Sequence, residues 1–210
     1  MNEVLEAIKT RRSIRSYEAK PVPRDILQTL VEAGNDAPSA MNAQPWRFVV
    51  VTDQKLRQLL AQTAAPNARK YFEAFKESNP ERYAVIMKRF DEMTDPVYYS
   101  APAIVFVIGS GPQAADGCPM ACLNIMLACR SLGLGSCWVK LGSLITENPE
   151  ITKALNLKEN EQIFGPILLG YPKDIPAAPK KNNPEFHGYR NFDRASKLFN
   201  ERIRHNGVHT

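Results

Sequence analysis

Apolar residues recur along this chain at helical and at strand-like spacings, and the two patterns alternate from the N-terminus onward. The first helical pattern begins after Asn2, a good N-cap residue, and extends to about Thr10. It places Val4, Leu5 and Ile8 on one side of the helix, and we expect that side to be buried. The first predicted element is therefore an amphipathic helix that packs on the body of the protein.

A second helix and a first strand follow. Pro21 and Pro23 suit the first turn of a helix, and Gly34 is a suitable left-handed residue to end it. Between them, three apolar residues recur at helical spacing: Leu27, Leu30 and Val31. A β-branched run then predicts a strand at about 47–52, after which Asp53 caps a further helix. That helix directs three leucines inward: Leu56, Leu59 and Leu60.

The second half of the chain contains further apolar segments that predict strands, at 103–108, 134–139 and 163–169. The first is short and uninterrupted before Gly109, which is typical of a buried central strand. Gly165 and Pro166 inside the last segment favour an edge position or a bulge. Residues 119–132 are apolar on nearly every side, so we expect a helix in the core or at a subunit interface. A shorter helix is expected at 149–155.

Other parts of the chain have weaker patterns. Residues 64–99 are polar, with aromatic residues among the charges. The simplest interpretation is that these rings anchor two surface helices, and the alternative is that some of them face a substrate pocket. Residues 172–191 are rich in Pro, Lys and Asn and predict an extended arm, after which 192–204 regain a helical pattern.

The length and charge of the chain restrict its class. A chain of 210 residues without an internal repeat or linker predicts one domain over 1–210, with the arm beginning at about 172. No apolar run approaches the roughly 20 residues that cross a bilayer, and no signal-peptide pattern is present, so we expect a cytoplasmic protein without a membrane partner. The net charge of +5 is thinly spread and accompanies no nucleic-acid motif, which argues against nucleic acid as a partner.

Four cysteines lie in one apolar region: Cys118, Cys122, Cys129 and Cys137. They form no CxxC pair, so they fit a reducing compartment, and their spacing does not match the common metal or iron–sulfur ligand sets. The three histidines, near the C-terminus, complete no recognisable catalytic set: His187, His205 and His209. Such a sequence suits a cofactor enzyme, because there the cofactor carries out the chemistry and the protein binds and orients it.

A polar loop at 37–48 is a candidate ligand-binding segment. Its sequence is Ala-Pro-Ser-Ala-Met-Asn-Ala-Gln-Pro-Trp-Arg-Phe. Its clustered Ser, Asn, Gln and Pro residues indicate an ordered loop that brings hydrogen-bonding groups to the end of a strand. Asn42 and Gln44 each offer a donor and an acceptor, which suits the polar edge of a planar heterocycle, and Trp46 would supply an apolar wall. A proline-stiffened turn without a ligand is the alternative.

A basic segment at 9–17 follows the first predicted helix. Its arginines surround Ser13, and guanidinium groups beside a hydroxyl suit a phosphate through forked, charge-assisted hydrogen bonds. Taken alone, the segment is equally well a solvated basic turn. No GxGxxG motif follows a predicted strand, so no Rossmann site for a permanently bound dinucleotide is expected.

Together these two stretches resemble the FMN-dependent nitroreductase family. The resemblance rests on Arg-Arg-Ser-Ile-Arg at 11–15 and Pro-Ser-Ala-Met-Asn-Ala-Gln-Pro-Trp at 38–46, and it continues through 132–138 and 168–172. It implies an α+β, nitroreductase-like fold, with a mixed, mainly antiparallel sheet flanked by helices. It also implies an intertwined homodimer with two FMN sites at the interface, in which the arm embraces the partner subunit and residues 64–99 form a lid.

The resemblance implies roles for individual residues as well. Arg11 and Arg15 would hold the FMN phosphate, and Arg12 and Ser13 would contact the phosphate, the ribityl chain or the ring edge. The loop would reach the flavin from the other subunit, with Gln44 supporting it, through four residues: Pro38, Ser39, Ala40 and Asn42. Backbone N–H groups of a third segment would lie near the flavin N5 and O4 edge: Lys140, Leu141 and Gly142.

The chain departs from the family pattern at two places. Lys140 stands where many relatives carry Gly or an acidic residue, which leaves the electronics of the site and the substrate entrance open. In the arm, Lys180 and Lys181 follow Pro179 where relatives usually place Arg. Either lysine would supply a point charge to the phosphate without the fork of Arg, or both are simply solvated.

The implied activity is electron transfer from NADH or NADPH to nitroaromatic, quinone or related acceptors, by a ping-pong hydride relay through one pocket. The same scaffold supports reductive dehalogenation, enone reduction or flavin breakdown, and fold resemblance does not separate these reactions. Outside the enzymes, the alternative is a flavin-binding protein without turnover, in which residues 64–99 cover the face of the ring.

Overall fold

The computed structural model describes residues 2–185. The chain divides into a compact unit, Met1–Ala178, and a second unit, Pro179–Thr210, whose described residues 179–185 form no helix or strand. The elements are α1 (Glu3–Thr10), α2 (Arg24–Asn35), the 3-10 turn η1 (Ala40–Asn42), β1 (Trp46–Val51), α3 (Gln54–Glu73), α4 (Pro80–Glu92), β2 (Ala103–Ser110), α5 (Ala114–Ser131), β3 (Gly135–Trp138), the 3-10 turn η2 (Lys140–Ser143), α6 (Pro149–Ala154), β4 (Glu161–Ile163) and β5 (Ile167–Gly170). None of the described helices has the length and apolar character needed to cross a membrane.

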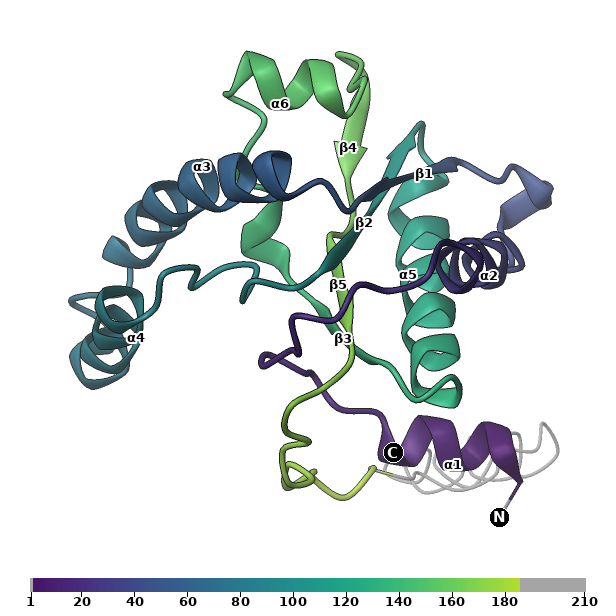
Figure 1. Ribbon diagram of the computed structural model, residues 1–210, viewed down its shortest axis with the longest axis horizontal. Coiled ribbons are helices and arrows are strands. Elements are labelled where there is room, and N and C mark those ends of the chain that lie inside the picture. The colour runs from purple at the N-terminus through teal and green to yellow at the C-terminus, as the bar shows by residue number, and fades with distance from the viewer. Residues whose placement is uncertain (1, 186–210) are drawn as a thin grey trace, which may run out of the picture. The chain divides into compact units, whose positions relative to one another are not determined.

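The strands of the first unit form one sheet with the order β1-β2-β5-β3, and β4 pairs with β2 beyond the end of β5 (Figure 1). Each of these strand pairs is antiparallel. The central strand β2 pairs with β1 from Gly109 opposite Trp46 to Ile104 opposite Val51. The continuous apolar run at 103–108 is fully buried, so the prediction of a central strand is confirmed.

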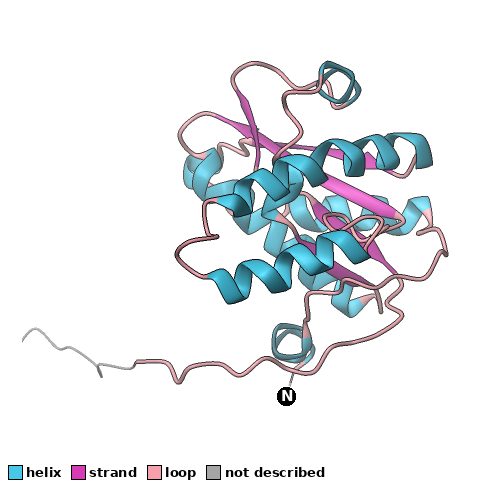
Figure 2. Ribbon diagram, turned by 90° about the vertical axis from the view of Figure 1, so that its left-hand side faces the viewer, coloured by secondary structure: helices cyan, strands magenta, loops and turns pink. Residues whose placement is uncertain are grey.

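Helices cover both faces of the sheet. Figure 1 shows α2 and α5 on one side, and Figure 2, viewed from the other side, shows α3 and α4 in front of the strands. Alternate residues of β2 enter two separate cores, because successive side chains of a strand point to opposite faces. Ile104, Phe106 and Ile108 pack with the α3–α4 side, and Ala103, Val105 and Val107 pack with the α2–α5 side. The α+β fold with flanking helices is therefore confirmed.

Helix α1 begins as predicted, since Asn2 Oδ1 accepts a hydrogen bond from the N–H of Leu5 at 2.9 Å. The expected burial of its apolar side is wrong for this chain. Val4, Leu5 and Ile8 remain 65%, 53% and 54% exposed. The helix lies at the periphery and contacts α5, and none of its residues is buried in the described structure. Its apolar stripe therefore needs a cover from outside the described chain.

Two glycine predictions also need correction. Gly34 does not end α2 as a left-handed residue; it is buried within the helix, where a Cβ atom would come within 2.8 Å of Ile125. Gly165 and Pro166 do not mark an edge strand, because β5 lies between β2 and β3. They divide the predicted strand at 163–169 into β4 and β5. The N–H groups of Phe164 and Gly165 both donate to the carbonyl of Val107, so two residues oppose one, which agrees with the bulge that was the other alternative.

The weakly periodic region at 64–99 forms the second half of α3, all of α4 and the loop that leads into β2. Aromatic rings join the two helices: Phe72 of α3 meets Phe90 of α4 edge to face, with ring centroids 5.9 Å apart. Both surface helices are therefore confirmed. Residues 173–185, the described part of the predicted arm after Pro172, form no helix or strand, and its embrace of a partner stays a prediction. The helix predicted at 192–204 lies outside the described residues, as do His187, His205 and His209.

Candidate functional site

The basic segment runs beside β3. Ser13 forms a parallel bridge with Ser136, and the N–H of Ile14 donates to the carbonyl of Ser136 at 3.0 Å. Ile14 is buried against Gly135, where an added Cβ atom would come within 2.7–2.9 Å of the Ile14 side chain. Because successive residues of an extended chain point to opposite sides, burial of Ile14 turns Ser13 and Arg15 the other way.

The side chains of Ser13 and Arg15 turn toward the thiol of Cys137. Burial raises the pKa of Cys137, and the guanidinium of Arg15, a hydrogen bond from Ser13 and the charges of Arg11 and Arg89 act in the opposite direction. Arg11 and Arg15, four residues apart, and Arg89, distant from both in the sequence, therefore lie close enough to act on one thiol. We call this set, Arg11, Ser13, Arg15 and Arg89 around Cys137, the cationic face.

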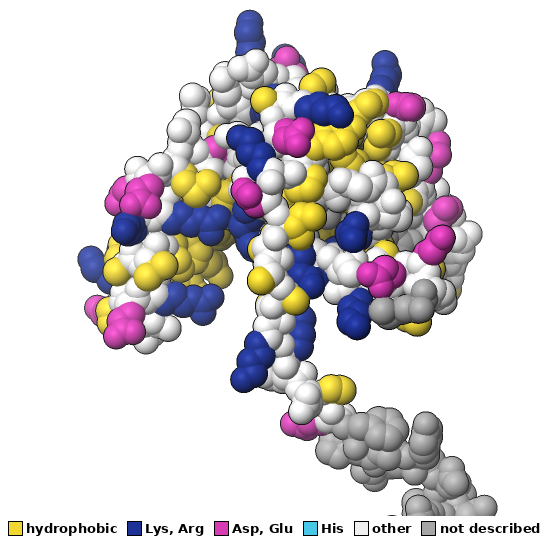
Figure 3. Space-filling view, turned by 60° about the horizontal axis from the view of Figure 1, so that its bottom comes forward, with side chains coloured by type: hydrophobic (Ala, Val, Ile, Leu, Met, Phe, Trp, Pro, Cys, Tyr) yellow, Lys and Arg dark blue, Asp and Glu magenta, His cyan; other side chains and the backbone are white. Residues whose placement is uncertain are grey.

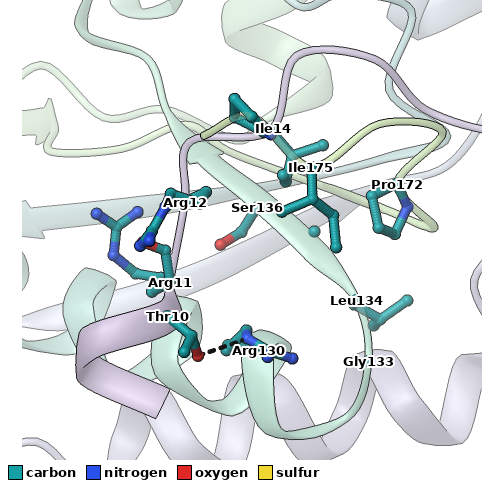
Figure 4. Close-up of a pocket in the computed structure, with 12 residues that line it drawn as sticks. Thr10, Arg11, Arg12, Ile14, Arg130, Gly133, Leu134, Ser136, Pro172 and Ile175 are labelled. Carbon is teal, nitrogen blue, oxygen red and sulfur yellow. Dashed lines mark hydrogen bonds between the residues drawn. The ribbon is translucent and has the colours of Figure 1, made fainter. Parts of the chain in front are cut away.

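Arg12 has a different position. Its Nη1 donates to the carbonyls of Lys9 and Arg11, each at 2.9 Å, so its guanidinium satisfies the C-terminal end of α1. Arg11 and Arg12 also line a pocket of about 210 Å³ at whose base Arg130 donates to Thr10 Oγ1 at 2.9 Å (Figure 4). A pocket of this volume is smaller than the roughly 300–1,000 Å³ of ordinary cofactor sites.

The loop before β1 is exposed and has an unusual backbone. Met41, Asn42 and Gln44 have φ values of 54°, 52° and 44°, in the left-handed region that residues other than Gly seldom adopt. Ser39 Oγ accepts a hydrogen bond from the N–H of Gln44 at 2.9 Å, which holds the loop in this form. Such backbone conformations occur most often at ligand sites and switch regions.

Other residues of the predicted loop pack differently from one another. Ala37 is buried, whereas Pro38 and Ala40 are exposed and Ser39 is half-buried. Trp46 is 9% exposed, packs in the α2–α5 core and donates to Asn35 Oδ1 at 3.1 Å. It also lines a pocket with Gln44, so its role as an apolar wall for a ligand stays a prediction. Trp46 thus anchors the loop to the core.

The loop and the basic segment do not meet within this unit. The loop leads into β1, at one edge of the sheet. The basic segment runs alongside β3, at the other edge. Three strand spacings of about 4.8 Å separate β1 from β3, and the basic segment lies one further spacing beyond β3. Figure 1 shows the loop on the far side of α2 from the segment that leads out of α1.

The third predicted segment forms η2, directly after β3. Lys140 is exposed, Leu141 is half-buried and Gly142 is buried. The hydroxyl of Tyr98 donates to the carbonyl of Gly142 at 2.6 Å, and a Cβ atom at Gly142 would lie 2.5 Å from Pro166. Lys180 and Lys181, the two cations predicted in the arm, are exposed residues of the second unit.

One member of the cationic face was not predicted. Arg89 lies on α4, and its Cζ atom stands 4.7 Å from the centre of the Tyr99 ring, while Arg15 Cζ stands 6.0 Å from the same centre. Nothing local in the sequence marks Arg89, because its relation to Arg15 depends on how α4 packs against the loop before β2.

A sequence model of the nitroreductase family matches residues 8–171 of this chain. The chain belongs to the nitroreductase family. It is 31% identical to an NADPH-flavin oxidoreductase of Vibrio harveyi, over 84% of this chain and 68% of that protein. It is 27% identical to an iodotyrosine deiodinase of Thermotoga neapolitana, over 88% of this chain and 94% of that protein.

Solved structures agree with this assignment. A nitroreductase with bound FMN from Bacteroides fragilis superposes with a TM-score of 0.66 and 33% identity, over 90% of this chain and 98% of that one. The family resemblance inferred from the motifs at 11–15 and 38–46 is thereby confirmed, as is the nitroreductase-like fold.

Proposed function

We propose that this nitroreductase-family protein is an FMN-dependent oxidoreductase that accepts electrons from NADH or NADPH and passes them in alternation to nitroaromatic, quinone or related acceptors. The observation that carries the proposal is the cationic face, which gathers Arg11, Ser13 and Arg15 beside β3. The FMN bound by the Bacteroides fragilis structure and the activity named for the Vibrio harveyi relative support it.

The residues present fit FMN. Guanidinium and hydroxyl donors converge from an extended segment whose position is fixed by the close contact of Ile14 with Gly135. Forked donors of this kind suit one phosphate. The N–H groups of Lys140 and Leu141 in η2 would face the ring, whereas the N–H of Gly142 donates to the carbonyl of Val139 at 3.1 Å. In this arrangement Arg11, Ser13 and Arg15 bind and orient the cofactor.

When held by Arg11, Ser13 and Arg15, FMN would supply the hydride-transfer chemistry between the nicotinamide and the acceptor, and the described residues contribute no nucleophile to it. Cys118, Cys122 and Cys129 are buried, and burial raises the pKa of Cys118 to about 11 and of Cys122 to about 12. These thiols therefore stay protonated near neutral pH and pack as apolar side chains.

We further infer a homodimer whose subunits share each site. The apolar side of α1 is exposed, and so are Leu123 and Leu132 of α5, which leaves a large apolar surface for a second copy of the chain. The loop with Asn42 lies at the opposite sheet edge from Arg15, so a partner chain is needed to bring the two together. A flavin-binding protein without turnover would have the same shared site, so the dimer does not distinguish the two alternatives.

Flavin identification and reduction test the proposal. Heat release followed by mass spectrometry should recover FMN, and FAD or no flavin would contradict the cofactor assignment. Anaerobic mixing with NADH or NADPH should bleach the flavin absorbance. A stably yellow protein would favour the binding protein without turnover.

Mixed dimers test the shared site. A heterodimer with Arg15→Ala in one chain and Asn42→Asp in the other collects both changes in one pocket if the two residues come from opposite subunits. Flavin titration should then show one tight and one very weak site. Two equally weakened sites would place both residues in the same subunit.

A second reaction is supported by the deiodinase relative, of which 94% is covered by the match. Reductive removal of iodide from 3-iodotyrosine would use the same flavin site, because fold alone does not separate these reactions. Turnover of 3-iodotyrosine in preference to nitroaromatics would replace the first proposal with this one.

A further inference from the structure

Arg89 is held in place on α4 without a carboxylate partner. Its neighbour Lys88 pairs with Glu92 at 3.7 Å, and Asp91 pairs with Arg69 at 2.7 Å. Within residues 2–185, no acidic side chain lies in ion-pair distance of Arg89. Its Nε instead contacts the sulfur of Met93 at 3.4 Å, and a thioether is a weak acceptor that carries no charge.

The ring beneath Arg89 is fixed. Tyr99 and Ser100 have φ values of 54° and 53°, so two successive residues adopt left-handed backbone conformations. The carboxylate of Asp95 accepts hydrogen bonds from the N–H groups of Val97, Tyr98 and Ser100, at 3.2, 2.7 and 2.9 Å. The surrounding hydrogen bonds thus hold a backbone conformation that residues other than Gly seldom adopt.

The same loop is tied to the predicted flavin edge. The Tyr98 hydroxyl bonds to the carbonyl of Gly142 in η2, while the next residue, Tyr99, contacts Arg15 and Arg89. Burial raises the pKa of Tyr99, so its phenol stays neutral near pH 7 and does not neutralise the two arginines. Figure 3 shows Lys and Arg side chains gathered in a hollow beside the lobe formed by α3 and α4, next to apolar side chains.

The contact of the Arg89 guanidinium with the Tyr99 ring leaves N–H donors of Arg89 available for a ligand. A guanidinium over an aromatic ring uses its face, and its N–H groups point outward in the plane, where they match the two oxygens of a carboxylate. Arg11 and Arg15 belong to the segment beside β3, whereas Arg89 belongs to the helix pair that covers the sheet. Arg15 and Arg89 therefore reach the same Tyr99 ring from different elements.

We propose that Arg89 binds a carboxylate on the aromatic electron acceptor, so that the site favours anionic acceptors over neutral ones of the same shape. This inference rests on the proposed flavin oxidoreductase function and adds a substrate class to that site. Tyr99 is a positioning residue, because it holds the guanidinium in place.

The test uses FMN-loaded protein and two acceptors of nearly equal shape, para-nitrobenzoate and the neutral para-nitrobenzamide. Dissociation constants come from the change in flavin absorbance without a reductant, and Michaelis constants and turnover numbers come from steady-state rates. In Arg89→Gln, the dissociation constant and the Michaelis constant for the nitrobenzoate should both rise about tenfold, the effect of losing one exposed charge-assisted bond. Both constants for the nitrobenzamide, and the turnover numbers for both acceptors, should stay within about twofold of the unsubstituted protein.

Lys88→Gln is the matched control, because it removes the same charge from the adjacent residue of the same helix. It should behave as the unsubstituted protein, and Arg89→Lys should recover part of the loss. Equal changes for the two acceptors, or a change in the affinity for FMN or for NADPH alone, would overturn the assignment.

The two proposals fail in different ways. A protein without FMN is seen in its spectrum before any acceptor is added, and a flavin that is not bleached by NADH or NADPH removes the oxidoreductase function. In the second case the dissociation constants still report whether Arg89 prefers the carboxylate. No preference in the unsubstituted protein would overturn the inference while FMN binding and reduction remain intact.

Discussion

The ion pair between Arg47 and Glu161 fastens β1 to β4, directly after the predicted flavin loop. Arg47 donates to both carboxylate oxygens, at 2.7 and 2.6 Å, and also to the carbonyls of Leu155 and Asn156. The N–H of Lys158 donates to the same carboxylate at 2.9 Å. Replacing Glu161 by Gln keeps the shape of the side chain and removes its charge.

The hydrogen bond from Arg47 lowers the pKa of Glu161 from its usual 4.5 to about 2. Each tenfold change in a proton dissociation constant corresponds to about 1.4 kcal/mol, so the carboxylate stabilises the folded protein by about 3 kcal/mol at pH 6. Because the pKa is lowered in the folded state, this stability is present above pH 4.5 and is lost as the pH falls toward 2. By pH 3 we expect about 1.4 kcal/mol to remain.

Urea unfolding followed by tryptophan fluorescence measures this effect. The difference in the free energy of unfolding between the unsubstituted protein and Glu161→Gln should shrink by about 2 kcal/mol from pH 6 to pH 3. Protein and FMN concentrations are kept constant, because association and ligand binding also shift stability. Glu159→Gln, an exposed carboxylate two residues away, should show no such change. A difference that stays constant between the two pH values would refute the reasoning.

Three further substitutions test the packing around the site. Asp95→Ala removes the acceptor of three backbone hydrogen bonds and should lower the free energy of unfolding in urea by about 3 kcal/mol; a loss below 1 kcal/mol would contradict the role of the carboxylate. Gly109→Ala places a Cβ atom 2.4 Å from Cys118 Sγ and should cost about 1–3 kcal/mol in thermal unfolding, partly recovered by Cys118→Ala. Gly135→Ala pushes against Ile14 and should weaken FMN binding about tenfold in a fluorescence titration; an unchanged FMN affinity would contradict the role of this contact in positioning the basic segment.

Elements whose causes are local could be predicted from the sequence. Asn2 and Asp53 were predicted as helix caps, and each accepts the expected hydrogen bond three residues ahead. The apolar run at 103–108 was predicted as a central strand because it is apolar at every position, which an exposed face would not allow.

Features that depend on distant partners were missed. The exposure of Val4, Leu5 and Ile8 could not be predicted, because periodicity shows that a helix has an apolar side but not what covers it. The position of β5 inside the sheet depends on pairing with both β2 and β3, which outweighs the local tendency of Pro166 to lie at an edge.

The candidate site divides in the same way. The basic segment and the loop were recognised from their residue types, since guanidinium, hydroxyl and amide groups reveal their chemistry in the sequence. Arg89 was missed because helical sequences contain many arginines, and only the loop from Asp95 to Ser100 brings this one to Tyr99.

The sheet register has a consequence for how this protein changes during evolution. Val51, the last residue of β1, pairs directly with Ile104 of β2, so the chain leaves the sheet after Val51 and returns to the same place at Ala103, the first residue of β2. The whole helical pair, with Arg89 and Tyr99, is thus an excursion from a single β-hairpin. Insertions or deletions in its exposed connections leave the strand register unchanged, whereas the buried residues of α3 and α4 stay tied to the core. New acceptors can therefore be acquired by altering this excursion while the cofactor-binding framework is inherited intact.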